Sequence, residues 1–298
     1  MSEAVRPEGP DLSRREFVKT VGAAVLTSTV GTPVAPAETA VARFYRSLKR
    51  DQKASLCFPH DHPLRSVVRP NWAIVRPTIR DLTGEQQSLC EEVFKTLCSD
   101  DGRDRFLRQM GEDYGGFGSY HVAVFGQPGT GQPFEWVLTG RHVTLRTDGL
   151  SPVGPLFYGH ATLGSHGGTR RAGNVWRYQA ERADALFQTL DDTQTARALT
   201  CRAESGLGVG SLDGQQRRMV RDLLGGLFLP FRYPDSDSVV SCLCDRGGVD
   251  SLRLTCGRQD PSPDVWNLQG PDFSWYFHGS PHVHAWLTVS KSFTKLRV

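Results

Sequence analysis

The sequence predicts an α+β fold in which one helix-plus-hairpin unit occurs twice, with both units packed as one pseudo-twofold domain. A capped amphipathic helix near Thr83 recurs near Asp213 without a gap. The aromatic hairpin motif Phe134-x-Trp136-x-x-x-Gly140 recurs as Phe273-x-Trp275-x-x-x-Gly279. Because both features repeat in the same order, we interpret the chain as an internal duplication, with antiparallel β-hairpin units at about 80–148 and 211–291.

Each repeated helix is predicted by a capping box followed by an apolar stripe. Thr83-x-x-Gln86 and Asp213-x-x-Gln216 carry the capping residues. The stripes fall at spacings that form one helix face. They are Leu89, Cys90, Val93, Phe94, Leu97 and Cys98 in the first helix, and Met219, Val220, Leu223, Leu224, Leu227 and Phe228 in the second.

The remaining elements are placed around these units. Alternating apolar runs that end in Gly126 and Gly257 predict a strand upstream of each hairpin. Between the copies we expect a Gly-rich loop over 149–174 and a helix over about 175–200. The segment 38–80 is expected to hold a short helix, Ala40–Lys49, and then a Pro- and Arg-rich loop.

The first 37 residues are typical of an export signal peptide. Ser13-Arg14-Arg15-Glu16-Phe17-Val18-Lys19 resembles the bacterial twin-arginine signal, a weakly apolar run follows, and Ala35-Pro36-Ala37 offers a small-x-small cleavage site. We therefore expect residues 1–37 to be a signal peptide and 38–298 to be a single domain. The expected partners are the twin-arginine export machinery and a signal peptidase, and the expected location is the periplasm or the extracellular space.

The composition argues against two classes of protein, those that bind nucleic acid and those that span a membrane. A chain of 298 residues with 38% hydrophobic residues can build a core. A formal net charge of +3 gives no reason to expect nucleic acid as a partner. No stretch approaches the roughly 18 consecutive apolar residues of a spanning helix, so we expect no integral membrane segment in the mature chain.

The cysteines do not define a structural zinc site. Their number, seven, is odd, and no CxxC pair is present. Cys90 and Cys98 lie on the apolar stripe of a predicted helix, where a thiol acts as a small hydrophobe. An oxidising compartment permits a disulfide among the others, and the sequence does not choose the pair.

An ordered series of motifs runs through the mature chain. It comprises Arg69-x-x-Trp72, Leu82-Thr83-x-x-Gln86, Tyr120-x-Val122-x-Val124-Phe125-Gly126-x-Pro128, Trp136-x-x-x-Gly140-x-His142 and Pro155-x-Phe157-x-Gly159. Over about residues 55–290 this series resembles the bacterial family known as domain of unknown function 3500. The resemblance implies an exported protein and brings no established reaction, cofactor or substrate. Members often carry two adjacent His after the hairpin Gly, where this chain has Arg141 and His142.

Histidines supply the candidate metal ligands. His282-x-His284 in a strand puts two imidazoles on one face, and the repeat relates His282 to His142. If the hairpins meet, these three could hold a divalent transition metal such as zinc, copper or iron, with His160 as a further candidate. The alternative is that the imidazoles are partly buried and hydrogen-bonded within the sheet. His60-Asp61-His62 could also bind metal, or could form a solvated turn in which Asp61 caps a backbone N–H.

Two function hypotheses lead at this point, ahead of a third, a purely structural interaction module. The first is an exported metal-dependent enzyme with metal at the histidine cluster. The second is a non-catalytic ligand-binding protein of the cell envelope with an aromatic cleft. The candidate ligand-binding residues are Trp136, Trp275, Arg141 and Phe157, and the small-molecule ligand is unknown. Alternatively, the aromatic residues belong to the hydrophobic core.

Overall fold

The computed structural model describes residues 36–148, 154–160, 174–200, 203–232, 247–257, 263–280 and 282–289. These residues belong to one compact unit, Ala35–Val298, and the other unit is Met1–Val34. The expected export signal lies outside the described residues, except for Pro36 and Ala37 at the start of a helix.

Ten strands form one mixed sheet in the order β1-β2-β3-β4-β5-β10-β9-β8-β7-β6. Neighbouring strands are antiparallel throughout, apart from the parallel pair β1 and β2. The strands are β1 (Cys57–Phe58), β2 (His121–Gly126), β3 (Phe134–Gly140), β4 (Val143–Thr147), β5 (Gly154–His160), β6 (Leu207–Gly208), β7 (Arg253–Cys256), β8 (Val265–Gly270), β9 (Phe273–His278) and β10 (Val283–Val289).

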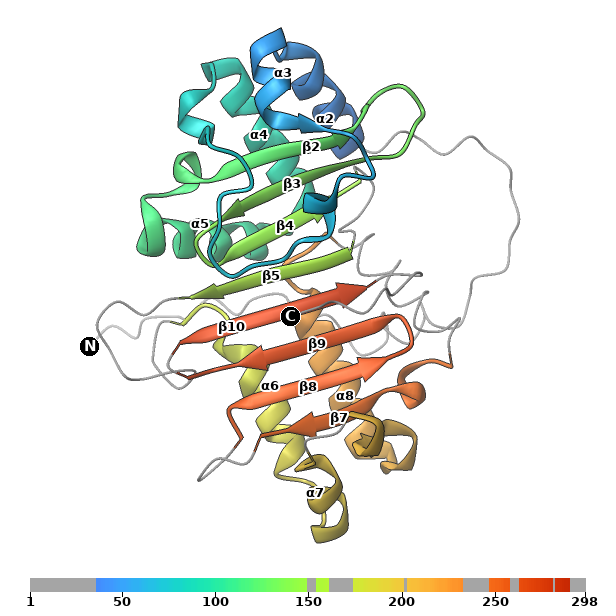
Figure 1. Ribbon diagram of the computed structural model, residues 1–298. Coiled ribbons are helices and arrows are strands. Elements are labelled where there is room, and N and C mark those ends of the chain that lie inside the picture. Colours follow the sequence, from blue (N-terminus) through green and yellow to red (C-terminus); the bar gives the residue numbers. More distant parts are fainter. Residues whose placement is uncertain are drawn as a thin grey trace, which may run out of the picture. The chain divides into compact units, whose positions relative to one another are not determined.

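Helices cover one face of this sheet. Figure 1 shows α4, α5, α6 and α8 behind the strands. The α-helices among the described residues are α2 (Pro36–Ser47), α3 (Arg50–Leu56), α4 (Gly84–Leu97), α5 (Asp100–Tyr114), α6 (Arg177–Phe187), α7 (Asp192–Ala198) and α8 (Gly214–Phe228). A largely antiparallel sheet with helices on one face confirms the predicted α+β class. None of the described helices has both the length and the apolar character that crossing a bilayer requires.

The two capped helices are confirmed. Thr83 caps α4 and Asp213 caps α8, each in a capping box with the Gln three residues later. The single helix expected over 175–200 is wrong, because the structure has α6 and α7 there. Asp191 accepts a hydrogen bond from the backbone N–H of Gln194, and this second capping box starts a new helix.

Two further expectations need correction in the strands. The described part of the expected loop 149–174 includes a full strand, β5, which pairs with β10 at the centre of the sheet. The structure also contains β8 between β7 and β9, a strand that the predicted repeat omits. In the sheet order, β3 is the second strand from β5, and β8 is the second strand from β10. The position of β3 therefore corresponds to that of β8, and not to that of β9 as the predicted repeat requires.

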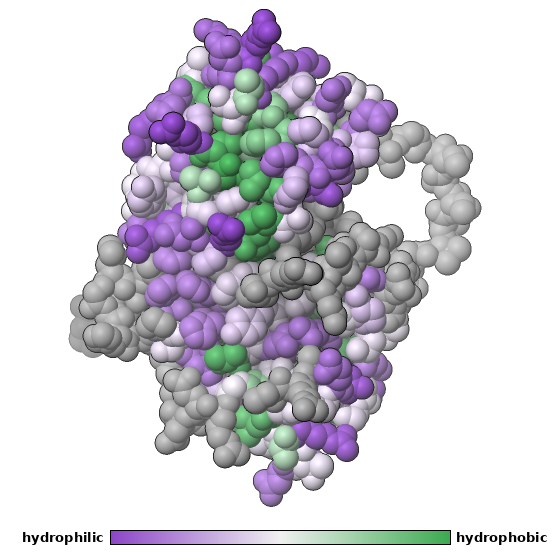
Figure 2. Space-filling view, in the orientation of Figure 1, coloured by the Kyte–Doolittle hydropathy of each residue, from purple (hydrophilic) through white to green (hydrophobic). Residues whose placement is uncertain are grey.

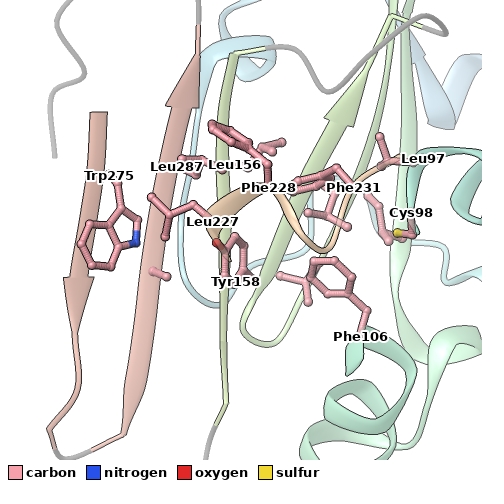
Figure 3. Close-up of a cluster of buried hydrophobic side chains, with 14 of the residues drawn as sticks. Leu97, Cys98, Phe106, Leu156, Tyr158, Leu227, Phe228, Phe231, Trp275 and Leu287 are labelled. Atoms are coloured by element: carbon pink, nitrogen blue, oxygen red, sulfur yellow. The ribbon is translucent and has the colours of Figure 1, made fainter. Parts of the chain in front are cut away.

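The core runs across the middle of the sheet. Figure 3 shows a cluster of buried side chains that extends from Trp275 of β9 past Leu227 of α8 and Tyr158 of β5 to Phe106 of α5. All four side chains are fully buried. Buried residues from both sides of the central β5–β10 pair belong to one hydrophobic cluster.

On the face of the sheet that α4, α5, α6 and α8 do not cover, burial differs between β3–β4 and β9–β10. Every residue of β3 and β4 is buried, because segment 63–78 crosses over them. Trp72 donates to Thr144, and Arg65 pairs with Glu135. In contrast, β9 and β10 largely alternate buried and partly exposed residues. Figure 2 shows this face, with hydrophobic residues gathered mainly over the upper strands.

Candidate metal centre

Three of the candidate histidines come together in the structure. His142, His282 and His284 each offer one ligand nitrogen, and these nitrogens all lie within 4.8 Å of one another. The ring centroids of His282 and His284 are 4.5 Å apart, and that of His142 lies 5.0 and 5.3 Å from them. The group could therefore hold a metal ion.

The sheet order explains why residues so distant in sequence meet. Strands β4 and β10 run in the same direction because each pairs antiparallel with β5 between them. Their N-terminal ends therefore lie at the same end of the sheet, on the left in Figure 1. His142 immediately precedes β4, and His282 immediately precedes β10.

His142 occupies a strained position in the turn between β3 and β4. Its φ of 56° makes it the one non-glycine residue with positive φ among the described residues. L-residues rarely adopt this conformation, and it persists only where surrounding contacts enforce it. Its N–H donates to the Pro70 carbonyl at 2.7 Å, while its carbonyl accepts from Gln109 Nε2 at 3.0 Å and from the Gly159 N–H at 2.9 Å.

Asp113 of α5 orients the imidazole of His142. The Asp113 Oδ2 to His142 Nδ1 distance is 2.8 Å, and both side chains are buried. A carboxylate on one ring nitrogen of a metal-binding His fixes the tautomer and leaves the other nitrogen for the ion. Asp113 is not among the residues that the sequence predicts. Gln109, one helical turn earlier, holds the backbone of the same histidine.

Gly159 makes room for His284. It lies opposite His284 in the β5–β10 pair. A Cβ at position 159 would lie 2.3 Å from the Val283 carbonyl oxygen and 3.1 Å from His284 Cδ2. A side chain there would push against both the strand and the imidazole ring. On the other side of His284, its partner in β9 is His278, whose ring centroid is 6.4 Å away.

Burial favours the uncharged form of His282 and His284. Desolvation and the neighbouring histidines lower the pKa of His284 to about 3. Desolvation also lowers the pKa of His282, helped by His142 and partly opposed by Asp113. A neutral imidazole has the lone pair that a metal requires. At neutral pH these two side chains are therefore in the form that can bind a cation.

The predicted aromatic ligand contacts lie elsewhere. Trp136 and Trp275 are fully buried, and the Trp275 indole N–H donates to Gln179. This placement matches the core alternative, because neither ring reaches the surface. The side chains of Phe157 and His160 lie outside the described residues, although the backbone of His160 stands opposite Val283.

The His60-Asp61-His62 group forms part of a turn. His62 Nδ1 accepts from the Leu64 N–H at 3.3 Å and caps the short 3-10 helix Pro63–Ser66. The capping group is thus His62, not Asp61 as expected. The His62 ring also lies 4.8 Å from that of Phe58.

The trio satisfies the main chemical requirement of a transition-metal site. Nitrogen ligands at 2.0–2.1 Å from one ion lie about 3.3 Å apart in a tetrahedral site. The ligand nitrogens lie within 4.8 Å of one another, so the rings would have to move closer together when an ion binds. Three imidazoles leave one tetrahedral position open, as in catalytic rather than structural zinc sites.

The fold and the cluster define an α+β protein with a candidate three-histidine metal centre. The chain belongs to DUF3500, a family of proteins of unknown function, whose model matches residues 30–226. His142 and Asp113 fall inside the matched range, whereas His282 and His284 lie beyond it. No curated protein and no solved structure matches the chain.

Proposed function

We propose that this protein is an exported metal-dependent enzyme in which His142, His282 and His284 hold one divalent transition metal. The observation that carries the proposal is the convergence of three imidazole nitrogens within 4.8 Å. Zinc, copper and iron all accept imidazole ligands. A metal with an open position supplies Lewis-acid chemistry, by which it activates water or binds oxygen.

The chain's own residues prepare this centre. Asp113 holds the proton of His142 on Nδ1 and presents Nε2 to the ion. Gln109, Pro70 and Gly159 fix the strained turn, so that the ring orientation does not depend on a flexible loop. Preorganisation of this kind reduces the free-energy cost of assembling a site when the metal binds.

The alternative, a non-catalytic ligand-binding protein of the cell envelope, is favoured by one surface feature. Tyr276 and Trp286 lie on the partly exposed face of β9 and β10 with their ring centroids 5.3 Å apart. The ring of His284 is 5.7 Å from that of Trp286. Adjacent, partly exposed aromatic rings suit the binding of a flat or sugar-like ligand.

We also infer that residues 1–37 direct export through the twin-arginine route, with cleavage after Ala37. The twin-arginine pair, the apolar run and the small-residue site support this proposal. The proposed cleavage after Ala37 falls at the start of α2. Because the twin-arginine route carries folded proteins, the metal would be acquired before export to the periplasm or beyond.

Internal duplication is the evolutionary part of the proposal. Gln52 and Gln86 exchange hydrogen bonds at 2.8 and 3.0 Å, and Gln194 and Gln216 do the same at 3.1 and 2.9 Å. In each pair the second Gln completes the capping box of α4 or α8. The mirrored strand order supports a pseudo-twofold relation of the halves.

The sheet suggests a revised repeat alignment. Trp266 and Leu268 of β8 lie 130 residues after Trp136 and Leu138 of β3, the same offset as between the capped helices. All four side chains are fully buried. In this alignment His142 corresponds to Asp272, so the histidines meet through strand order and not as equivalent residues of two repeats.

Metal content tests the proposed function. The full chain, purified after growth with added zinc, copper or iron, should contain about one ion per molecule. The double variant His142→Ala with His284→Ala should contain none. His121→Ala is the matched control, because His121 is a partly buried strand histidine outside the trio. Substoichiometric metal in the wild type, or full metal in the double variant, would refute the centre.

A further inference from the structure

An aromatic pair lies on the partly exposed face of β9 and β10, beside the candidate metal centre. Tyr276 and Trp286 stand opposite each other in the β9–β10 ladder, with their ring centroids 5.3 Å apart. Trp286 is partly exposed and Tyr276 is 38% exposed. No described helix covers β9 and β10 on this face (Figure 1). Large aromatic rings bury most of their area in a protein core, so a pair that stays accessible is suited to contact a ligand.

The pair is continuous with the metal ligands. His284 precedes Trp286 by two residues, so both side chains lie on the same face of β10. Their ring centroids are 5.7 Å apart, and the ring planes are nearly perpendicular, at 88°. An ion bound to an imidazole nitrogen lies about 3 Å from the centroid of that ring. An ion on His284 would therefore lie no more than about 9 Å from the centroid of Trp286. A single ring with a short substituent can span that distance.

The inclination of the two rings favours a planar ligand over a saturated one. The planes of Tyr276 and Trp286 are inclined by 50°. A sugar or another saturated ring can lay its C–H face flat against only one of two rings inclined in this way. A planar aromatic ligand can stack on one ring and meet the other edge-on, and both contacts are preferred arrangements of aromatic pairs. The surface therefore matches an aromatic ligand at both rings.

We propose that the substrate of the metal centre is an aromatic compound with an oxygen donor on a short substituent. The oxygen occupies the open metal position, and the ring packs against Trp286 and Tyr276. This proposal rests on the proposed function, because the metal holds one end of the ligand. It assigns the aromatic pair to the substrate site of the enzyme rather than to a separate binding protein. The two rings thereby select ligands by shape.

Calorimetric titration of the zinc-loaded full chain tests the proposal with three hydroxamates, which share one metal-binding group. Benzohydroxamate carries a planar ring, cyclohexanecarbohydroxamate carries a saturated ring of the same size, and acetohydroxamate carries no ring. We expect benzohydroxamate to bind about 10-fold more tightly than either of the others, because contacts between aromatic rings add to the free energy of area burial.

Substitution of the aromatic pair locates the contact. Trp286→Ala should remove most of the preference for benzohydroxamate and leave acetohydroxamate binding unchanged, which shows that the metal centre of the variant is intact. Trp286→Phe should keep most of the preference, because it retains an aromatic ring. Tyr45→Ala is the matched control, since Tyr45 is a partly buried aromatic residue of α2, a helix that packs against α4.

The outcomes separate this proposal from the metal centre itself. Zinc uptake with equal binding of the planar and saturated probes, or with tighter binding of the saturated one, would overturn the aromatic specificity and leave the centre standing. Zinc uptake without binding of benzohydroxamate would do the same, and so would an unchanged preference in Trp286→Ala. If the wild type takes up no zinc, the metal centre fails and this proposal fails with it. Tyr276→Ala, at the more exposed ring, gives the answer if Trp286→Ala does not fold.

Discussion

Asp113 Oδ2 and His142 Nδ1 lie 2.8 Å apart in the interior, so a helix carboxylate determines which nitrogen of a turn histidine faces His282 and His284. The contact links α5 to the end of the sheet where β4 and β10 begin. It is the arrangement in which a second residue orients a metal ligand.

Replacing Asp113 should weaken metal binding without removing a ligand. We expect Asp113→Asn to lower metal affinity by about 10- to 100-fold, because the amide no longer holds the Nδ1 proton with a charge. Metal affinity by chelator competition measures the effect. Asp104→Asn on the exposed side of the same helix is the control and should bind metal normally. Unchanged affinity in Asp113→Asn would mean that the carboxylate does not orient the ligand.

Adding a side chain at Gly159 should disrupt the centre from the opposite strand. In Gly159→Ala the new Cβ would press on the Val283 carbonyl and the His284 ring. We expect loss of metal binding together with reduced thermal stability. Gly111→Ala is the control, because a Cβ at this exposed helix position would meet nothing within 4 Å. The control should be neutral or stabilising, by up to about 1 kcal/mol. Normal metal content in Gly159→Ala would contradict the tight fit at His284.

The buried Glu135–Arg146 pair should matter for stability rather than for metal binding. Glu135 Oε1 accepts from Arg146 Nε at 2.8 Å, and both side chains are buried. Glu135→Ala should reduce the free energy of unfolding by about 3–5 kcal/mol, because it leaves a buried guanidinium without its carboxylate. Urea unfolding measures this loss. Folded Glu135→Ala should retain its metal, and a loss of metal at normal stability would contradict the assignment.

Two thiols should resist alkylation in the folded protein. Desolvation raises the pKa of Cys57 to about 11 and that of Cys256 to about 12. The reactive form is the thiolate, so at pH 8 each should react at least roughly 100-fold more slowly than a thiol of pKa about 8.5. Raising the pH should speed the reaction steadily. Mass spectrometry of iodoacetamide-treated peptides, with urea-unfolded protein as the control, measures it. Rapid labelling of folded Cys57 at pH 8 would contradict the raised pKa of this partly buried thiol.

The sequence predicts α4 and α8 well because their signals are local, whereas α3 and α5 are not predicted. Capping boxes and apolar stripes locate α4 and α8 almost to the residue. The break between α6 and α7 is also local, and the Asp191–Gln194 box that causes it is visible in the sequence. Strand β8 is harder to predict, because a half-exposed strand of mixed residues has a weak pattern.

The histidine trio is predictable in part. The HxH spacing predicts that His282 and His284 lie on the same side of a strand. The repeated aromatic hairpin motif identifies His142 as a third candidate. The actual reason they meet is that β5 lies between β4 and β10, and pairing of distant strands is not encoded locally. Asp113 could not be predicted, because a polar residue on a helix carries no sign of the turn it will contact.

X-ray absorption of the zinc-loaded full chain tests the central claim most directly. Nitrogen and sulfur ligands differ in bond length, at about 2.0–2.1 Å and 2.3 Å respectively. We predict three imidazole nitrogens at the shorter distance with one further light ligand, and the loss of imidazole scattering in His142→Ala with His284→Ala. A spectrum dominated by sulfur, or one unchanged by the double substitution, would show that the metal binds elsewhere in the chain.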